Sequence, residues 1–442
     1  MFTGFQSLKK PYGYLLLLVF YTSGLHAQTQ PNIIYIMTDD LGYADLSCYG
    51  RKDYKTPNLD KLAAQGMKFM NAYAAAPLCT PTRVAFMTGR YPARTPLGLT
   101  EPIDWIAKDS LVGLSGDIPS IATRMRSAGY ETYLVGKWHL GFKPDFSPLR
   151  NGFDYFFGFN GGGVDYISHK SPDGDPDLFE NYQPVEMKGY MTDLLAQKAV
   201  SVINKPHNHP FFLNIMFSAP HWPWQGRGDK AYPDTMDWKT AGGSAAIYAS
   251  MMKSLDDAVG VILKALDDKK IARNTVVIFT SDNGGERFSD MGIYRGRKAQ
   301  LWEGGIRVPA FVRWPGKISA GASTNQLVTT LDWTATILAI AKAKPILSFP
   351  LDGTDISQVL TGKQKDMEHA MYWRSFQRNK HKAMRDGKWK YMQDEKGGEY
   401  LFDLIADPSE KNDLKDKEEE VFKNLKAKYA AWEAQMLKPV PL

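Results

Sequence analysis

Hydrophobic and polar positions along the chain alternate in the way that is typical of an α/β sheet protein. Short apolar runs rich in β-branched and aromatic residues predict buried strands, and amphipathic stretches between them predict helices. The predicted strands are 32–37, 131–136, 210–218, 274–281 and 308–316, and the predicted helices are 56–66, 119–129 and 245–270. In the first helix Thr56 is the expected N-cap, Pro57 lies in the first turn and Gly66 marks the end. We therefore expect one large sheet, mixed but mostly parallel, flanked by helices.

The last hundred residues follow a different pattern. Shorter strands are predicted at 370–375, 382–392 and 398–404, and a helix of mixed charge follows at 417–436. This order predicts a small antiparallel sheet with a closing helix, packed on the main domain. We divide the chain into a catalytic domain, 28–365, and a C-terminal subdomain, 366–442. The segment 142–190 is rich in Gly, Pro, Asp and aromatic residues, and it is predicted to be a long functional loop.

The first 27 residues have the pattern of a secretory signal peptide. Lys9 and Lys10 precede a short apolar core, and "LHA" before Gln28 has the small residues of a cleavage site. No later segment has the roughly 18–20 apolar residues of a transmembrane helix. We expect a periplasmic or secreted protein without a membrane span. The net charge of +6 is mild, and basic and acidic residues are interspersed, which argues against a nucleic-acid partner.

Polar residues follow four of the predicted strands at the point where each strand ends. These residues are Asp39 and Asp40, Lys137 and His139, His221, and Asp282 and Asn283. Because ligands of open parallel sheets bind outside the carboxyl ends of the strands, we expect these side chains to share one site. Asp39, Asp40, Asp282 and Asn283 offer only oxygen ligands, which suit a hard cation such as calcium or magnesium. Calcium is slightly favoured because it accepts more ligands at looser geometry, and no zinc-type spacing is present.

Basic residues could complete this site as a pocket for a tetrahedral anion. Arg83, Lys137 and Lys298 are the candidates, since arginine binds oxyanions with two prongs and lysine as a point charge. Cys79 precedes a predicted helix at 80–89, whose N-terminus also favours an anion. The chain has only one other cysteine, Cys48, so the pair could form a disulfide, or Cys79 could be a nucleophile or a ligand.

The segment "CTPTR", residues 79–83, resembles the Cys-x-Pro-x-Arg signature of the type I sulfatases, within the alkaline phosphatase superfamily. Further segments resemble blocks of that family in the same order, among them "PNIIYIMTDDLGYADLSCYG", "GYETYLVGKWHLG", "SDNGG", "LWEGGIRVPAFVRWPG" and "LFDLIADPSEKNDL". Together they extend over most of residues 31–415. The resemblance implies an alkaline phosphatase-like fold and hydrolysis of sulfate esters.

The resemblance also implies roles for individual residues. Cys79 would be converted to formylglycine (3-oxoalanine) by a maturation enzyme, and a Cys48–Cys79 disulfide would remove that nucleophile. The implied ligands of one calcium ion are Asp39, Asp40, Asp282, Asn283 and the modified Cys79. Arg83 would stabilise the formylglycine hydrate, and Lys137 and His139 would lie at the nucleophile. His221 and Lys298 would bind sulfate near the leaving oxygen, which His221 would protonate. The second hydroxyl of the hydrate, helped by His139, would then release sulfate.

The substrate is expected to be a sulfated sugar of a polysaccharide or glycosaminoglycan. Aromatic and polar residues in 151–170 and 221–228 suit a sugar ring, and Arg94, Asp165, His169 and Trp224 are the candidate substrate contacts. Two alternatives stay open. One is a phosphonate monoester or phosphodiester hydrolase with the same fold and nucleophile, and the other is a non-catalytic glycan-binding protein.

Overall fold

A ten-stranded mixed sheet forms the centre of the molecule. The computed structural model describes residues 1–4, 30–104, 112–233, 236–238, 242–376 and 380–439. In the order in which they pair, the strands are β10 (Ala322–Thr329), β2 (Met67–Tyr73), β9 (Ala310–Arg313), β8 (Thr275–Ser281), β1 (Asn32–Thr38), β7 (Phe211–Met216), β3 (Glu131–Lys137), β4 (Tyr155–Phe159), β5 (Phe179–Glu180) and β6 (Gln183–Pro184). The central strands β8, β1, β7, β3 and β4 are parallel, whereas β9 runs antiparallel to both of its neighbours. The predicted mixed, mostly parallel sheet is confirmed.

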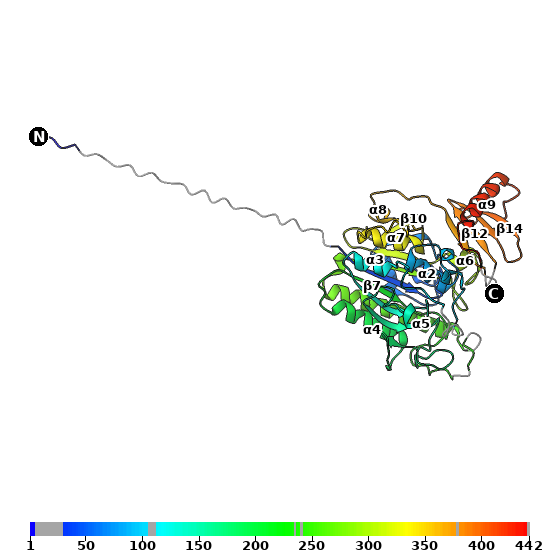
Figure 1. Ribbon diagram of the computed structural model, residues 1–442, viewed down its shortest axis with the longest axis horizontal. Coiled ribbons are helices and arrows are strands. Elements are labelled where there is room, and N and C mark those ends of the chain that lie inside the picture. The colour runs from blue at the N-terminus through cyan, green and yellow to red at the C-terminus, as the bar shows by residue number, and fades with distance from the viewer. Residues whose placement is uncertain (5–29, 105–111, 234–235, 239–241, 377–379, 440–442) are drawn as a thin grey trace.

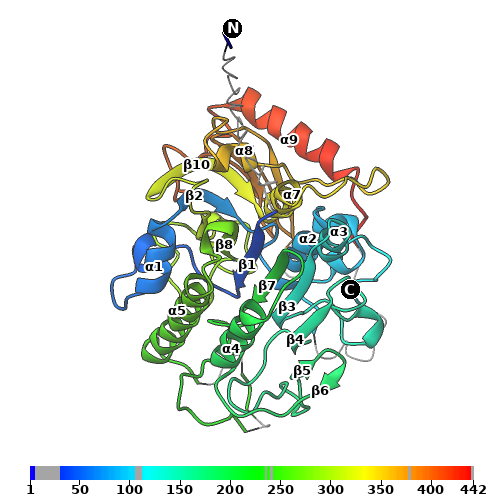
Figure 2. The same cartoon turned by 90° about the vertical axis from the view of Figure 1, so that its left-hand side faces the viewer.

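Helices cover both faces of this sheet, so the main domain has three layers (Figures 1 and 2). Alternate residues of strand β1 pack against the helices on opposite faces of the sheet. Ile34 and Ile36 pack with α1 (Pro57–Ala64), α4 (Met191–Asn204) and α5 (Ala245–Asp268). Ile33, Tyr35 and Met37 point to the other face and pack with α2 (Cys79–Thr88), α3 (Ile121–Ser127) and α7 (Thr330–Ile340). Because successive side chains of a strand alternate in direction, a continuous apolar run is buried on both sides.

The strand ends bring the predicted polar residues to one edge of the sheet. Strands β1, β8, β7 and β3 are adjacent and parallel, so their carboxyl ends lie side by side. Gly136, just before the last residue of β3, allows β3 and β7 to approach closely. A Cβ atom at this position would lie 2.0 Å from the Met216 carbonyl oxygen. The following residue, Lys137, is therefore held against the centre of the edge.

The strands that the sequence analysis did not predict lie on either side of the predicted set. Strand β2 is only half-buried over most of its length, and β10 begins with the polar run "ASTNQ". Neither has the apolar run on which the prediction rests. The segment 142–190 was predicted to be a loop, but it contains β4, β5 and β6. That prediction was wrong because Gly and aromatic residues occur both in loops and in closely packed strands. Gly158 of β4 is an example: β4 packs so closely on β3 that a Cβ atom at this position would lie 1.9 Å from the Gly136 carbonyl oxygen.

The C-terminal residues form a separate antiparallel sheet, as predicted (Figure 1). Its strands are β11 (Met371–Arg374), β12 (Lys382–Asp386), β13 (Trp389–Gln393) and β14 (Glu399–Asp403). One face packs on the main domain through an apolar cluster that includes Leu301, Trp302 and Trp373. The other face is covered by α9 (Glu419–Glu433). Two short helices, α6 (Glu303–Ile306) and α8 (Ser357–Leu360), complete the secondary structure discussed below.

The predicted signal peptide, 1–27, lies almost wholly outside the described residues, since 5–29 are not described. No helix within the described ranges has the length and apolar character required to cross a membrane.

Candidate active site

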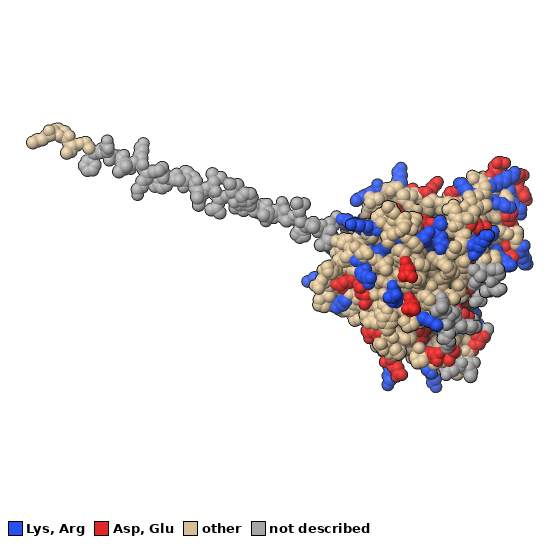
Figure 3. Space-filling model, in the orientation of Figure 1, with Lys and Arg blue, Asp and Glu red and all other residues tan. Residues whose placement is uncertain are grey.

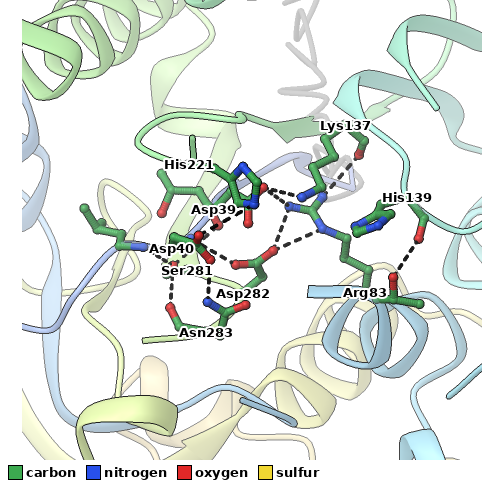
Figure 4. Close-up of polar contacts among 12 residues, drawn as sticks. Asp39, Asp40, Arg83, Lys137, His139, His221, Ser281, Asp282 and Asn283 are labelled. Carbon is green, nitrogen blue, oxygen red and sulfur yellow. Dashed lines mark hydrogen bonds and ion pairs between the residues drawn. The ribbon is translucent and has the colours of Figure 1, made fainter. Parts of the chain in front are cut away.

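Four oxygen-bearing side chains meet at the carboxyl edge of the sheet: Asp39, Asp40, Asp282 and Asn283 (Figure 4). All four are buried. Asn283 Nδ2 donates to Asp40 Oδ1 over 2.8 Å, and the Asp40 amide donates to Asp282 Oδ1 over 3.3 Å. Asp39 Oδ1 and Asn283 Oδ1 have no hydrogen-bond partner among the described residues. Asp40 also holds a left-handed backbone with φ of 62°, which is uncommon for residues other than glycine and turns its side chain into the cluster.

Each carboxylate of the cluster is paired with a cation: Asp39 with Lys137, Asp282 with Arg83, and Asp40 with Lys298. Lys137 and Arg83 are buried, and Lys298 is partly buried. Arg83 donates from Nε and Nη2 to one Asp282 oxygen over 3.1 and 2.8 Å. Lys298 Nζ lies 2.6 Å from Asp40 Oδ2. The three carboxylates and three cations balance in charge. A bound divalent cation would leave a net positive site, which suits an anionic substrate.

The ionisation of these carboxyl groups depends on how well the cations offset burial. Burial acts to raise the pKa of Asp39, but Lys137, Arg83 and the other positive groups around it together outweigh burial and hold that pKa well below the usual range. Burial raises the pKa of Asp282 to about 7, helped by the charge of Asp39. Burial likewise raises the pKa of Asp40 despite Lys298. Two of the three carboxyl groups therefore hold their protons more tightly than in water, which is the expected state of a buried acidic cluster without a further cation.

Two buried histidines flank the cluster. Burial and nearby positive charge hold the pKa of both His139 and His221 well below the usual value, so both rings are neutral at pH 7. His139 Nε2 lies 2.8 Å from the Ile103 carbonyl oxygen, and its Nδ1 has no partner among the described residues. His221 Nδ1 lies 2.5 Å from the Trp222 carbonyl oxygen, and its Nε2 lies 3.7 Å from Asp40 Oδ2. The carbonyl contacts fix the orientation of each ring.

The helix predicted at 80–89 is α2, and it begins one residue earlier, so that Cys79 is its first residue. No described side chain caps its N-terminus, and the positive end of the helix therefore lies at Cys79. Cys79 is buried, and burial raises the pKa of its thiol. An unmodified Cys79 is therefore protonated at neutral pH and would be a weak nucleophile. Both cysteines are free, so the disulfide alternative is wrong.

A pocket of about 250 Å³ opens above this cluster and exposes its catalytic candidates to substrate. Its lining includes Cys79, His139, His221 and Lys298. It also includes residues that the sequence analysis did not select: Leu78, Pro102, Ile103, Asp104, Gly162, Trp222, Glu286 and Ala299. Glu286 and Trp222 lie shortly after the ends of predicted strands, so the rule that ligands bind outside the carboxyl ends of parallel strands could have identified them. Asp104 follows no predicted strand, and no pattern in the sequence marks it as a site residue.

The four candidate substrate contacts do not line this pocket. Arg94 forms an ion pair with Asp352 over 2.8 Å. Asp165 is buried and accepts from Gln225 Nε2 over 2.7 Å, besides several backbone amides. In this structure both side chains are bound to partners within the protein, and their role as substrate contacts stays a prediction.

His169 and Trp224 likewise hold loops together. His169 is buried with Nε2 2.9 Å from the Gly189 carbonyl oxygen. Trp224 is buried against the edge of Phe288, with ring centroids 5.2 Å apart. Aromatic and polar residues of long loops fold onto one another here, so composition alone did not distinguish loop packing from ligand binding.

The oxygen cluster fits a hard divalent cation. Asp39, Asp40 and His221 offer atoms within 4.8 Å of one another, and Asp282 and Asn283 add further oxygens beside them. Buried polar atoms without partners are rare in folded proteins, and two such oxygens, on Asp39 and Asn283, lie in this cluster. Carboxylate and amide oxygens are the ligands that calcium and magnesium prefer.

Adding calcium to the metal-free protein should raise its melting temperature. At one hundred times the dissociation constant the stabilisation is about 2.7 kcal/mol, or roughly 3–5 °C for a large domain. Differential scanning calorimetry with and without calcium measures the shift. Asp282→Asn should abolish it, whereas Asp256→Asn, which alters a buried carboxylate outside the cluster, should retain it. A shift that persists in Asp282→Asn would contradict this ligand set.

Comparison with known proteins agrees with this geometry. The model of the sulfatase family matches residues 31–343. A second model, N-sulphoglucosamine sulphohydrolase, C-terminal, matches residues 291–435. The chain belongs to the sulfatase family. The resemblance to type I sulfatases is thereby confirmed, and the protein is a sulfuric ester hydrolase.

Individual relatives of this sulfatase differ in their named substrates. The N-acetylgalactosamine-6-sulfatase of Sus scrofa is 34% identical over 367 residues, which cover 77% of this chain and 68% of the relative. The steryl-sulfatase of Homo sapiens is 31% identical over 447 residues, covering 82% and 75%. The crystal structure of Ps i-CgsB in complex with k-i-k-neocarrahexaose has a TM-score of 0.82 and 31% identity, and covers 93% of this chain and 94% of that chain. The two curated relatives are sulfatases named for different substrates, and the solved structure shares the fold of this chain.

In this sulfatase, the C-terminal sheet holds the segment that carries Lys298. Three residues beyond Lys298, the Leu301 carbonyl accepts from Lys390 Nζ over 2.8 Å, and the Leu301 amide donates to His381 Nδ1 over 3.2 Å. Lys390 also pairs with Glu303 and Glu410, at 2.9 and 2.7 Å, and all three side chains are buried. The active-site segment 298–303 is thus fixed from both subdomains.

Replacing Lys390 by methionine should lower the free energy of unfolding by about 3–5 kcal/mol, because it removes the buried cation that Glu303 and Glu410 share and leaves only Glu303 with another cation, Arg307. Burial acts to raise the pKa of Glu303, but Lys390, Arg307 and Arg385 together outweigh it and lower that pKa to about 2, whereas burial raises that of Glu410 to about 7. Without Lys390 the folded-state pKa of Glu410 rises further above its unfolded value, and the pKa of Glu303 rises as well because one of the cations that oppose its burial is lost. The folded variant then binds more protons than the unfolded chain, so its stability should increase as the pH falls from 8 to 5.

Denaturant unfolding across this pH range measures both effects. Lys388→Met, on the same hairpin, removes a partly exposed pair with Asp403 and should cost at most about 1 kcal/mol. Equal stability of the two variants would show that the buried network does not hold the subdomains together.

Proposed function

We propose that this sulfatase hydrolyses sulfate esters of sugars, with formylglycine made from Cys79 as nucleophile and a calcium ion as cofactor. The observation that supports this proposal is that Cys79 and Lys298 line a pocket at the cluster in which the carboxylates pair with Arg83, Lys137 and Lys298. A protonated, buried thiol does not explain catalysis, whereas an aldehyde hydrate at the same position is a suitable nucleophile. The proposal requires a maturation enzyme, and the predicted export signal is consistent with a periplasmic or extracellular substrate.

In the proposed site the cation would be held by Asp39, Asp40, Asp282 and Asn283. The cation and the formylglycine would supply charge neutralisation and the nucleophilic oxygen for attack on sulfur. Arg83 and Lys137, fixed by their carboxylate partners, would hold the nucleophile and a sulfate oxygen in place.

In the proposed mechanism two histidines transfer protons, and Lys298 stabilises negative charge. Neutral His139 has an unpartnered buried Nδ1, so it can take a proton at the nucleophile. Lys298 carries a permanent positive charge: burial acts to lower its pKa, but Asp40, Cys79 and Asp39 together outweigh burial and raise it. It can therefore stabilise the leaving oxygen directly. His221 is neutral in the free protein, and a bound sulfate anion would favour its protonated form, which can then protonate the leaving alcohol.

A sugar substrate is supported by the relatives and by the pocket. The N-acetylgalactosamine-6-sulfatase and the k-i-k-neocarrahexaose complex are both named for carbohydrates. The pocket of this chain adds Trp222, Asp104 and Glu286 to the sulfate-facing residues, and such groups suit a sugar ring and its hydroxyl groups.

Turnover of an aryl sulfate should exceed that of the matching aryl phosphodiester. The reason is that the chain belongs to the sulfatase family, and its curated relatives are named for sulfate esters. The measurement is kcat/KM for both compounds with protein made in a host that converts Cys79. Faster phosphodiester turnover would identify a phosphodiesterase instead, and tight binding of a sulfated glycan without sulfate release would identify a non-catalytic glycan-binding protein.

A further inference from the structure

A basic hollow lies at the edge of the main sheet opposite the active site. It has a volume of about 540 Å³, and its lining includes Arg273, Lys317, Lys342, Lys363 and Trp314. None of the described residues that line it is Asp or Glu. The four cations are exposed, and none of them forms an ion pair with a described residue. On the face of the molecule in Figure 3, by contrast, basic and acidic side chains are mixed.

Four separate turns of the chain bring these cations together. Arg273 lies in a short 3-10 turn, η6 (Ala272–Asn274). The amides of Lys317, Lys342 and Lys363 donate to Trp314, Ala339 and Gln358 carbonyl oxygens over 3.0, 3.0 and 2.9 Å. These turns close the ends of β9, α7 and α8. The four charged residues are far apart in the sequence. The folded elements that carry them bring their backbone positions together.

A second hollow, of about 580 Å³, continues the first and shares Gln30 and Asn274 with it. Its lining adds Lys205 and Lys269, and within the part of the chain that the structure describes it contains no Asp or Glu. Lys205 lies 3.6 Å from Glu131, which is not part of the lining. The two hollows together form one groove, which we call the basal groove, with six lysine or arginine residues along it.

The basal groove is separate from the catalytic centre. Asn32, the first residue of β1, lines the groove, whereas Asp39 follows the last residue of β1 in the active site. A strand of this length spans about 23 Å. A ligand that occupies both sites must therefore be a long chain, and a small substrate cannot reach from one to the other.

We propose that the basal groove is a second binding site for sulfated polysaccharide chains, which retains the polymer while the active site releases sulfate. The nature of this ligand rests on the proposed function. An extended groove with spaced cations and no carboxylate attracts a polyanion. Trp314 offers an apolar surface for a sugar ring, and Gln30, Asn274 and Gln358 offer hydrogen bonds to hydroxyl groups.

The test compares two variants of equal net charge. The groove variant carries Arg273→Gln, Lys317→Gln, Lys342→Gln and Lys363→Gln. The control variant carries Lys52→Gln, Lys55→Gln, Lys396→Gln and Lys417→Gln, four exposed residues outside both hollows. Binding of chondroitin sulfate, dextran sulfate, uncharged dextran and double-stranded DNA is measured at low and high salt, and turnover of a small aryl sulfate is measured in parallel.

The groove variant should bind both sulfated polymers about ten-fold or more weakly at low salt, and the difference should shrink at high salt. The control variant should lose about two-fold or less, and aryl sulfate turnover should be equal in all three proteins. Equal losses in both variants, or a groove-dependent loss for DNA alone, would overturn the proposal. If the groove variant is unstable, Lys317→Arg, Lys342→Arg and Lys363→Arg should retain binding, and a loss there would overturn it too. Failure of aryl sulfate turnover in the wild type would instead count against the proposed function.

Discussion

Replacing Cys79 by alanine should lower sulfate release by roughly ten thousand-fold or more, because it removes the only residue from which the proposed nucleophile can be made. Cys79 begins α2 and is buried against the cations of the pocket. Alanine fills most of the same space, so folding should be retained. The measurement is kcat/KM for an aryl sulfate and for a sulfated sugar, together with the melting temperature.

The second cysteine provides the matched control. Cys48 is half-buried, and burial raises the pKa of its thiol to about 12, which makes it unreactive at neutral pH. Cys48→Ala should therefore leave sulfate release unchanged. Substantial activity in Cys79→Ala, or an equal loss in both variants, would show that the nucleophile lies elsewhere.

Replacing Lys298 by alanine should lower kcat/KM for a sugar sulfate by about a hundred- to ten-thousand-fold. The Lys298 ammonium group is the permanent cation beside the leaving oxygen in the proposed mechanism, and its loss also leaves Asp40 without its partner. The loss should be much smaller for an aryl sulfate whose phenolate leaves without a proton. His221→Ala should show the same dependence on the leaving group.

Arg297, the exposed neighbour of Lys298, is the control for a general change of charge in this loop. Arg297→Ala should leave both substrates nearly unaffected. If Lys298→Ala impaired the aryl sulfate and the sugar sulfate equally, Lys298 would act in binding the sulfate group and not in the departure of the alcohol.

The centre of the fold could be predicted from the sequence because it depends on a few strong local signals. The apolar runs that became β1, β3, β7 and β8 are buried on both faces, and their polar ends meet at one edge since the strands are parallel and adjacent. The rule that ligands bind outside the carboxyl ends of parallel strands is therefore enough to predict that Asp39, Lys137, His221 and Asp282 share one site.

The parts that could not be predicted depend on contacts between distant segments. Strand β10 is recognisable as a strand only through its pairing with β2, since its own first residues are polar. Asp165 looks like a substrate contact in its glycine-rich segment, but a bond to Gln225 some sixty residues away satisfies it. The buried network around Lys390, which fixes the segment of Lys298, likewise joins residues from two subdomains.

The buried network around Lys390 connects the C-terminal sheet to the active site. Lys390 and His381 hold the backbone of Leu301, while the other face of the same sheet is covered by α9. The position of Lys298 therefore depends on the docking of the whole C-terminal subdomain. A cut between the subdomains at 365/366, the predicted boundary, would separate Lys298 from its support.

The most direct test of the central claim is the mass of the tryptic peptide 69–83, which contains Cys79 as its only cysteine. The protein is prepared with graded amounts of the maturation enzyme, and the fraction of peptide with the mass of an aldehyde in place of the thiol is compared with sulfate turnover. We expect turnover to rise in proportion to the converted fraction and to vanish without it. Full turnover by protein whose peptide retains the unmodified thiol would contradict the account.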